Sequence, residues 1–107
     1  MLNELILIGN ATKDIELREA STGKEYCFMT LAITNAPNKK GEKTTDFIDV
    51  ILWDHSAKFA SSYIHKGDTV QLRGRLKVRV EEVDGKKKNV LQVVGYDVQR
   101  LTKSVEK

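Results

Sequence analysis

The sequence predicts a small all-β barrel of five strands, with a single helix between the third and fourth strands. Three observations carry this prediction. Several stretches alternate apolar and polar residues with a period of two, breaker-rich segments separate these stretches, and only residues 55–65 have apolar residues at helical spacing. A chain of 107 residues fits one domain with a modest core.

The first strand is expected at about residues 3–12. Its continuous apolar run, residues 5–8 (LILI), predicts that both faces of the strand are covered. Residues 15–20 are candidates to extend it, and residues 21–24 (STGK) form a turn. The second strand follows at about residues 26–35.

The second and third strands are expected to present aromatic residues outward. In the second strand, core-type residues alternate with a set that includes Phe28. The third strand, at about residues 46–53, follows a polar, exposed loop at residues 35–45 (NAPNKKGEKTT). If its even-numbered apolar residues point into the barrel, Phe47 and Trp53 point out.

Residues 55–65 form the predicted helix. Asp54 is expected to be its N-cap, because a carboxylate accepts free N–H groups of the first turn. Gly67 stands where a left-handed residue is wanted after the helix. We expect His65 to cap the helix and His55 to lie on the surface.

The fourth strand, residues 70–80, has the clearest alternation in the chain. Its even positions are apolar or glycine, and its odd positions carry four cations with no acid among them: Arg73, Arg75, Lys77 and Arg79. Residues 84–85 (Asp-Gly) mark a hairpin turn. A last strand is expected at about residues 89–101, and residues 102–107 form a frayed polar end.

The predicted order is three strands, a helix and two strands. This is the arrangement of the OB-fold, a partly open five-stranded barrel. We expect one such domain at residues 1–101.

Composition and motifs point to a binding protein rather than an enzyme. The net charge is +3 and the pI is about 9.0, so the placement of charge matters more than its excess. The single cysteine, Cys27, is expected to be a buried core residue. Neither histidine has a partner at metal-ligand spacing, and no nucleophile or phosphate-loop motif is present. We therefore expect no catalytic residue, no metal and no cofactor.

The apolar run near the N-terminus is too short for a signal peptide or a membrane span. We expect no contact with a membrane and a location in the cytoplasm.

Three sets of residues are candidates for binding single-stranded nucleic acid. The cationic face of the fourth strand suits a phosphate backbone, and the outward aromatics, Phe28, Phe47 and Trp53, suit stacked bases. Two loops add further cations that could wrap a strand: Lys39, Lys40, Lys43, Lys86, Lys87 and Lys88. The alternatives are a merely solvated strand face, aromatics that cover the barrel end or a subunit interface, and solvated loop tips.

The order and spacing of several short motifs resemble the bacterial-type single-stranded DNA-binding proteins over residues 1–101. The motifs are the opening MLNELILIGNATKDIELR, Thr30-Leu31-Ala32, Thr45-Asp46-Phe47-Ile48, Trp53 with Ala57, Tyr63 to Asp68 (YIHKGD) and Gly74-Arg75-Leu76.

The resemblance implies an OB-fold that binds single-stranded DNA without sequence preference, and it implies a homo-oligomer, with a tetramer favoured over a dimer. It also implies roles in replication, recombination or repair, where replication or repair proteins are candidate partners. Phe47 and Trp53 fall where the family carries base-stacking aromatics.

Two departures from the family pattern are visible. Further stacking aromatics of many members would fall near Ala36 or Pro37 and near Val80 or Glu81, and none of these is aromatic. Their loss predicts weaker binding or heavier reliance on charge, which Phe28 could offset in part. Residues 102–107 (TKSVEK) lack the family's acidic tip, so we expect either a truncated chain or a tailless member. The missing aromatics keep open an alternative function, a primosome-type OB-fold module that mainly binds protein.

Overall fold

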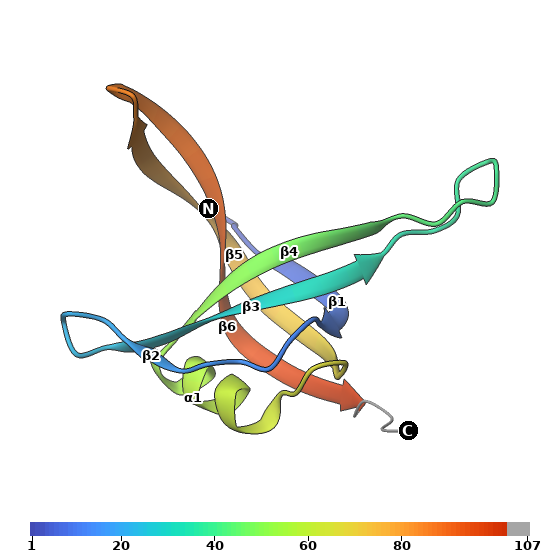
Figure 1. The fold of residues 1–107 in the computed structure, drawn as a ribbon, viewed down its shortest axis with the longest axis horizontal. Helices are drawn as coiled ribbons and strands as arrows, with labels where there is room; N and C mark the ends of the chain where they lie inside the picture. Colours follow the sequence, from blue (N-terminus) through green and yellow to red (C-terminus); the bar gives the residue numbers. More distant parts are fainter. Residues whose placement is uncertain (103–107) are drawn as a thin grey trace.

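The computed structural model describes residues 1–102. They form strands and one helix in the order β1 (Leu5–Ala11), β2 (Arg18–Glu19), β3 (Glu25–Thr34), β4 (Thr45–Trp53), α1 (Asp54–Tyr63), β5 (Thr69–Val83) and β6 (Lys86–Thr102). Figure 1 shows two long hairpins, β3–β4 and β5–β6, which extend from the barrel in different directions. Of the predicted frayed end, Thr102 belongs to β6, and the other residues lie outside the described part.

Five of the strands close into a ring. The sheet order is β1-β5-β6-β4-β3, and β1 also pairs with β3 through Asn10 and Ala11. β2 adds only two residues to the outer edge of β3, so it stands outside the ring. A five-stranded ring with the helix between its third and fourth strands in sequence confirms the predicted OB-fold.

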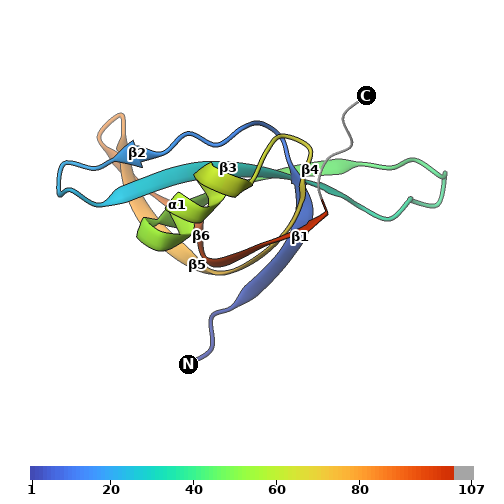
Figure 2. The same ribbon diagram turned by 90° about the horizontal axis from the view of Figure 1, so that it is seen from below.

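Helix α1 covers one opening of the ring, as the view from below shows (Figure 2). It packs against β3, β4 and β6 through Ala57 and Ala60, which are fully buried. Ile64, directly after the helix, is also buried and joins the same apolar core. No helix among residues 1–102 is long and apolar enough to cross a membrane.

Cys27 lies in the core, as predicted. Its thiol is fully buried among apolar side chains, and this burial raises its pKa to about 11. The core takes alternate residues from each strand of the ring, including Met29 and Leu31 of β3 and Val50 and Leu52 of β4, so the predicted parity of both strands is confirmed.

The predicted caps of the helix are wrong in two places. Strand β4 runs directly into α1, so the extended residue Trp53 occupies the N-cap position and no side chain caps the helix. Asp54 is instead the first helical residue, and its carboxylate accepts the N–H of Glu25 at 3.4 Å. At the other end Ile64 is the C-cap, and the N–H of His65 donates to the Asp68 carboxylate at 2.8 Å.

Gly67 does adopt the expected left-handed conformation, with a φ of 90°. The Asp84-Gly85 turn is also confirmed, since both residues have positive φ, 52° and 75°, as a two-residue type I′ turn requires.

The β5–β6 hairpin is longer than predicted. Residues 86–88 belong to β6 rather than to a loop, and they pair with residues 81–83 of β5. The even-numbered apolar residues of β5 are buried only as far as Gly74. Beyond it Leu76 and Val78 are exposed, because the hairpin has left the barrel and no element covers that side.

The prediction that both faces of β1 are covered is also wrong for a single chain. Leu5 and Leu7 pack against the core, but Ile6 and Ile8 remain 59% and 51% exposed. Only one side of this strand faces the barrel, so its outward apolar residues lack cover within the described chain.

Candidate nucleic-acid interface

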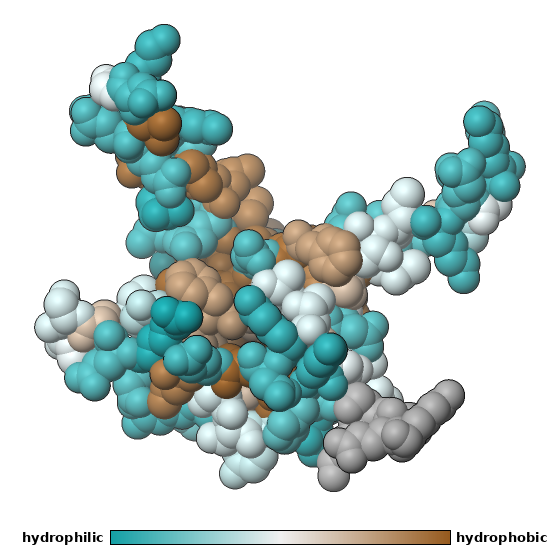
Figure 3. Space-filling model, in the orientation of Figure 1, coloured by the Kyte–Doolittle hydropathy of each residue, from teal (hydrophilic) through white to brown (hydrophobic). Residues whose placement is uncertain are grey.

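Strands β3 and β4 present the three predicted aromatics on their outer face. Phe28 is 47% exposed, Phe47 is 67% exposed and Trp53 is 38% exposed. In Figure 3 apolar residues gather over the middle of this face and along the lower part of one hairpin, whereas hydrophilic residues cover the hairpin tips. The rings are therefore accessible to a ligand that lies across the sheet.

The aromatics fall into two groups along the strands. Tyr26 lies between Phe28 and Trp53, with ring centroids 5.7 Å and 5.3 Å away respectively. Phe47 pairs with Ala32, four residues along β3 from Phe28, which is roughly 13 Å at the usual rise of a strand. The outer face thus offers one cluster of rings and one separate ring.

Sequence reasoning missed Tyr26 as a member of this cluster. It shares the parity of Phe28, and it lies directly opposite Trp53 in the register of β3 and β4. The alternation within the second strand could have found it, although the register could not be read from sequence.

A polar pair separates the two aromatic groups. Thr30 and Asp49 lie directly opposite each other on the outer face, and the Thr30 hydroxyl donates to Asp49 Oδ1 at 2.6 Å. The middle of this surface therefore carries a fixed negative charge.

The register of the sheet puts the cations of β5 on the same outer face as the rings. Arg75 pairs with Val94 of β6, Val94 pairs with Ile51 of β4, and Ile51 pairs with Phe28 of β3. Residues that are directly opposite share a face of the sheet. The cationic strand and the aromatic strands are therefore parts of one continuous surface.

Two hollows confirm that rings and cations meet. Trp53 and Lys77 line a shallow hollow of about 410 Å³ with Thr22 and Lys24. Phe28 and Arg79 line another of about 220 Å³, together with Asp49, Val50, Ile51, Val90, Leu91 and Gln92.

The four cations of β5 differ in how far their charge is already matched. Arg73 forms an ion pair with Glu4 at 2.6 Å, and Arg79 forms one with Glu81 at 2.6 Å. Arg75 and Lys77 have no ion pair with any residue in the range 1–102. Of the four cations, Arg75 and Lys77 therefore carry the charge that is most available to a phosphate.

Glu4 links Arg73 to a second group. The carboxylate accepts hydrogen bonds from Arg73 and from the Tyr96 hydroxyl, at 2.6 Å and 2.8 Å. The hydrogen bond from Arg73 is the largest cause that holds the pKa of Glu4 below its usual value. Arg73 is thus tied to the end of the barrel by a local network.

The predicted loop lysines divide between two hairpins. Lys39, Lys40 and Lys43 are exposed in the loop between β3 and β4, where the Asn38 side chain accepts the backbone N–H groups of Lys40 and Glu42. Lys86, Lys87 and Lys88 are exposed on β6, and the latter two lie opposite Glu82 and Glu81.

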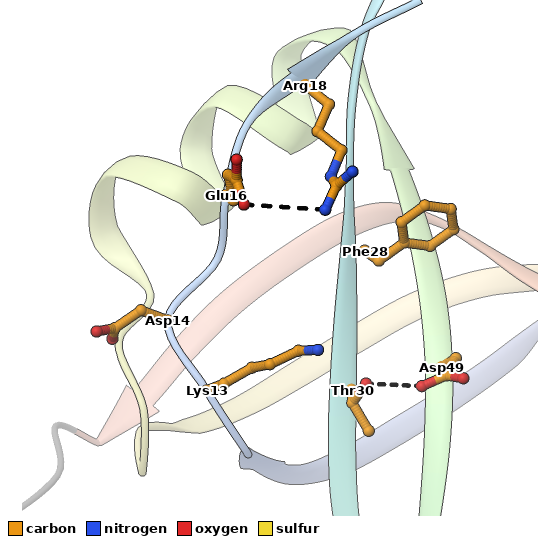
Figure 4. A pocket seen from close by; sticks show the side chains of 7 residues that line it. All are labelled: Lys13, Asp14, Glu16, Arg18, Phe28, Thr30 and Asp49. Atoms are coloured by element: carbon orange, nitrogen blue, oxygen red, sulfur yellow. Dashed lines mark hydrogen bonds and ion pairs between the residues drawn. The ribbon is translucent and has the colours of Figure 1, made fainter.

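A third hollow, of about 330 Å³, opens beside Phe28 (Figure 4). It is lined by Phe28, Thr30, Asp49, Lys13, Asp14, Glu16 and Arg18. Sequence reasoning did not select Lys13 and Arg18, because they belong to the irregular connection and the short strand before β3, whose position depends on the tertiary fold.

Among residues 1–102 there is no group of three or more histidine, cysteine, aspartate or glutamate side chains able to hold a metal ion. The arrangement of the site is one of stacking surfaces and charges.

Comparison with known proteins agrees with the fold and the surface. The model of the single-strand binding protein family matches residues 2–101. The chain is 38% identical over 103 residues to Single-stranded DNA-binding protein 1 of Clostridium acetobutylicum, covering 94% of each chain. It is also 38% identical over 103 residues to the Single-stranded DNA-binding protein of Bacillus cereus, covering 94% of this chain and 61% of that protein. A third relative, Single-stranded DNA-binding protein 1 of Streptococcus pyogenes serotype M18, is 36% identical over 105 residues, covering 96% of this chain and 81% of that protein. On the extent of these matches, the chain belongs to the single-strand binding protein family.

Proposed function

We propose that this chain binds and protects single-stranded DNA in replication, recombination or repair, and that residues 1–101 act as one binding domain. The observation that carries the proposal is the shared outer face of β3, β4, β5 and β6, on which exposed rings lie beside unpaired cations. Bases stack on the rings whatever their identity, because every base has a π-face. The cations replace counterions along the phosphate backbone.

The residues assigned to each role follow from this surface. Phe28 and Trp53 form a stacking platform with Tyr26, and Phe47 forms a second one. Arg75 and Lys77 are the principal phosphate contacts, and Arg73 and Arg79 contribute less because each already has an acidic partner. The hairpin lysines extend the positive surface at longer range.

The named relatives are single-stranded DNA-binding proteins, so a module that mainly binds protein is not favoured. We assign no catalytic step to the chain. The bacterial relatives and the DNA ligand support a cytoplasmic location near the chromosome.

Titration with oligo-dT tests the function. Trp53 is the single tryptophan of the chain, so quenching of its emission reports stacking at the platform. We expect quenching at low salt, and an affinity that falls steeply as salt is raised. Unchanged emission together with no mobility shift at low salt would refute the proposal.

We also propose that the chain works as a homo-oligomer, with a tetramer favoured over a dimer. Ile6 and Ile8 leave an apolar strip on β1, and from Leu5 to Gly9 this strand pairs only with β5 in the described chain, so one edge is open to another strand. Exposed apolar patches of this kind mark contact sites. The apolar side of the β5–β6 hairpin is a second candidate contact site, formed by the exposed residues Leu76, Val78, Val80 and Leu91.

Light scattering of wild type and of an Ile6→Glu/Ile8→Glu variant tests the assembly. We expect several subunits in the wild type and fewer in the variant, because buried charges on β1 would oppose the interface. A monomeric wild type would refute the oligomer, and an unchanged subunit count in the variant would exclude β1 from it.

A further inference from the structure

We propose that Asp49 makes the binding surface selective at one nucleotide, favouring a base with an exocyclic amino group over thymine. This inference rests on the proposed function and deepens it. The surface is otherwise suited to any base, so a fixed carboxylate in its middle needs a physical account.

Asp49 stands at the centre of the aromatic surface. It lies on β4 on the same side as Phe47 and Ile51, and it is exposed. The hydroxyl of Thr30 holds Oδ1 at 2.6 Å, and Oδ2 has no hydrogen-bond partner within residues 1–102. One oxygen therefore orients the group, and the other is available to a ligand.

A carboxylate at this position repels phosphate. No lysine or arginine of the described chain lies within ion-pair distance of Asp49, so its charge is not neutralised locally. The DNA backbone must therefore pass to one side of it, and a ligand group that meets Asp49 has to donate hydrogen bonds.

The surrounding hollow supplies the other parts of a nucleotide site. In Figure 4 the ring of Phe28 and the carboxylate of Asp49 lie over the β3–β4 sheet, and Lys13 and Arg18 reach toward them from the chain that leads to β3. Arg18 is loosely paired with Glu16 at 3.8 Å. Lys13 has no ion-pair partner in the described range, although it shares the hollow with Asp49.

Asp14 and Glu16 also line the hollow, but the placement of Lys13, Phe28 and Asp49 suits the three parts of a nucleotide. A phosphate fits at Lys13, a base fits against Phe28, and the edge of that base then meets Asp49. The hollow, at about 330 Å³, has the size at which small-molecule sites begin, roughly 300 Å³. Phe28 and Asp49 also line the next hollow with Arg79, so a second cation stands on the other side for the following phosphate.

The chemistry of base edges gives the direction of the selectivity. Aspartate accepts hydrogen bonds from the amino group of cytosine. Thymine presents a carbonyl oxygen at the equivalent position, which a carboxylate repels. Cytosine and thymine each stack a single ring of the same size on Phe28, so a difference between them reports the exocyclic group and not the ring size.

The experiment compares the affinities of oligo-dT and oligo-dC of equal length, at pH 8 and fixed salt, for wild type and Asp49→Asn. Asparagine can still accept the Thr30 hydroxyl, so the fold is kept. Intrinsic differences between the two homopolymers affect both proteins equally. They therefore cancel when the ratio of dissociation constants, Kd for dT over Kd for dC, is compared between wild type and variant. We expect this ratio to be about fivefold larger in wild type, the lower end for one good side-chain contact to a base.

Asp46→Asn is the matched control. It removes the same charge from the same strand, but Asp46 has the opposite parity and is held by Asn35 at 3.0 Å. Its ratio should equal that of wild type. A ratio in Asp49→Asn that equals the wild-type ratio would overturn the inference, even if both affinities rise from the loss of negative charge. If the wild type binds neither polymer, the proposed function fails, and this inference fails with it.

Discussion

Removing the two unpaired cations of β5 should weaken DNA binding by a predictable amount. Each phosphate contact on single-stranded DNA contributes a slope of about −0.7 to the logarithm of affinity against the logarithm of salt concentration. In the variant Arg75→Gln/Lys77→Gln two such contacts are lost, so the slope should become shallower by about 1.4. At 0.1 M salt the same relation predicts a loss of affinity of roughly 25-fold.

The structure explains why these two residues are chosen. Arg73 and Arg79 already have acidic partners at 2.6 Å, so their removal frees a carboxylate as well as losing a cation. Arg75 and Lys77 are exposed and have no such partner among the described residues. Glutamine is polar and uncharged, so it removes the positive charge while an exposed polar side chain stays at each position.

The assay is fluorescence anisotropy of labelled oligo-dT across a series of salt concentrations. The control is Lys66→Gln, which removes a positive charge from the turn after α1, where Lys66 is exposed and has no ion pair among the described residues. The control should keep the wild-type slope. If the β5 variant also keeps the wild-type slope, or if both variants change it equally, the phosphate backbone does not follow the cationic face of β5.

Three further predictions follow from single residues. Phe28→Leu keeps an apolar side chain but removes the ring, so binding of oligo-dT in the anisotropy assay should weaken by about 1 kcal/mol or more while the salt slope is retained. We expect the same of Trp53→Leu. A changed slope with unchanged affinity would contradict a stacking role. The hydrogen bond from Arg73 lowers the pKa of Glu4 below its ordinary value of 4.5 in the folded state. This contact therefore stabilises the fold above pH 4.5, and the stabilisation is lost as the pH falls through the lowered value. Urea unfolding of Glu4→Gln should depend less on pH in the acid range than that of wild type, and an equal dependence would contradict the ion pair. Burial raises the pKa of the Cys27 thiol to about 11, so a thiol reagent at neutral pH should modify the chain only after unfolding in urea; rapid modification of the native protein would show that the core is open at this point.

The order of strands and helix along the chain, and the outward aromatics, could be predicted because alternation is a local property of the chain. The parity of Phe47 and Trp53 followed from the buried partners between them, and the structure confirms it. The helix and the Asp-Gly turn were also local signals, since both depend on residues within one or two turns of chain.

The features that the sequence could not supply depend on tertiary structure. Aspartate is a residue type that favours the N-cap position, but β4 continues directly into the helix, so Trp53 and not Asp54 occupies that position. The apolar residues of β5 beyond Gly74 follow the core pattern, yet the hairpin has left the barrel there, so they lie exposed.

The ion pairs within the candidate site could not be predicted from the sequence either. The run of four cations looks uniform in sequence, but contacts with Glu4 and Glu81 divide it into paired and unpaired members. Glu4 is 69 residues away from Arg73 along the chain, so only the pairing of β1 with β5 brings the two together.

Photo-cross-linking with oligonucleotides that carry 5-iodo-deoxyuridine tests most directly whether bases lie on the outer face of β3 and β4. Mass spectrometry of the cross-linked peptides identifies the ring that each base touches. We predict cross-links to Phe28, Phe47 and Trp53 and none to Tyr63, which is comparably exposed but lies on α1. Cross-links confined to Tyr63, with none on β3 or β4, would contradict the account.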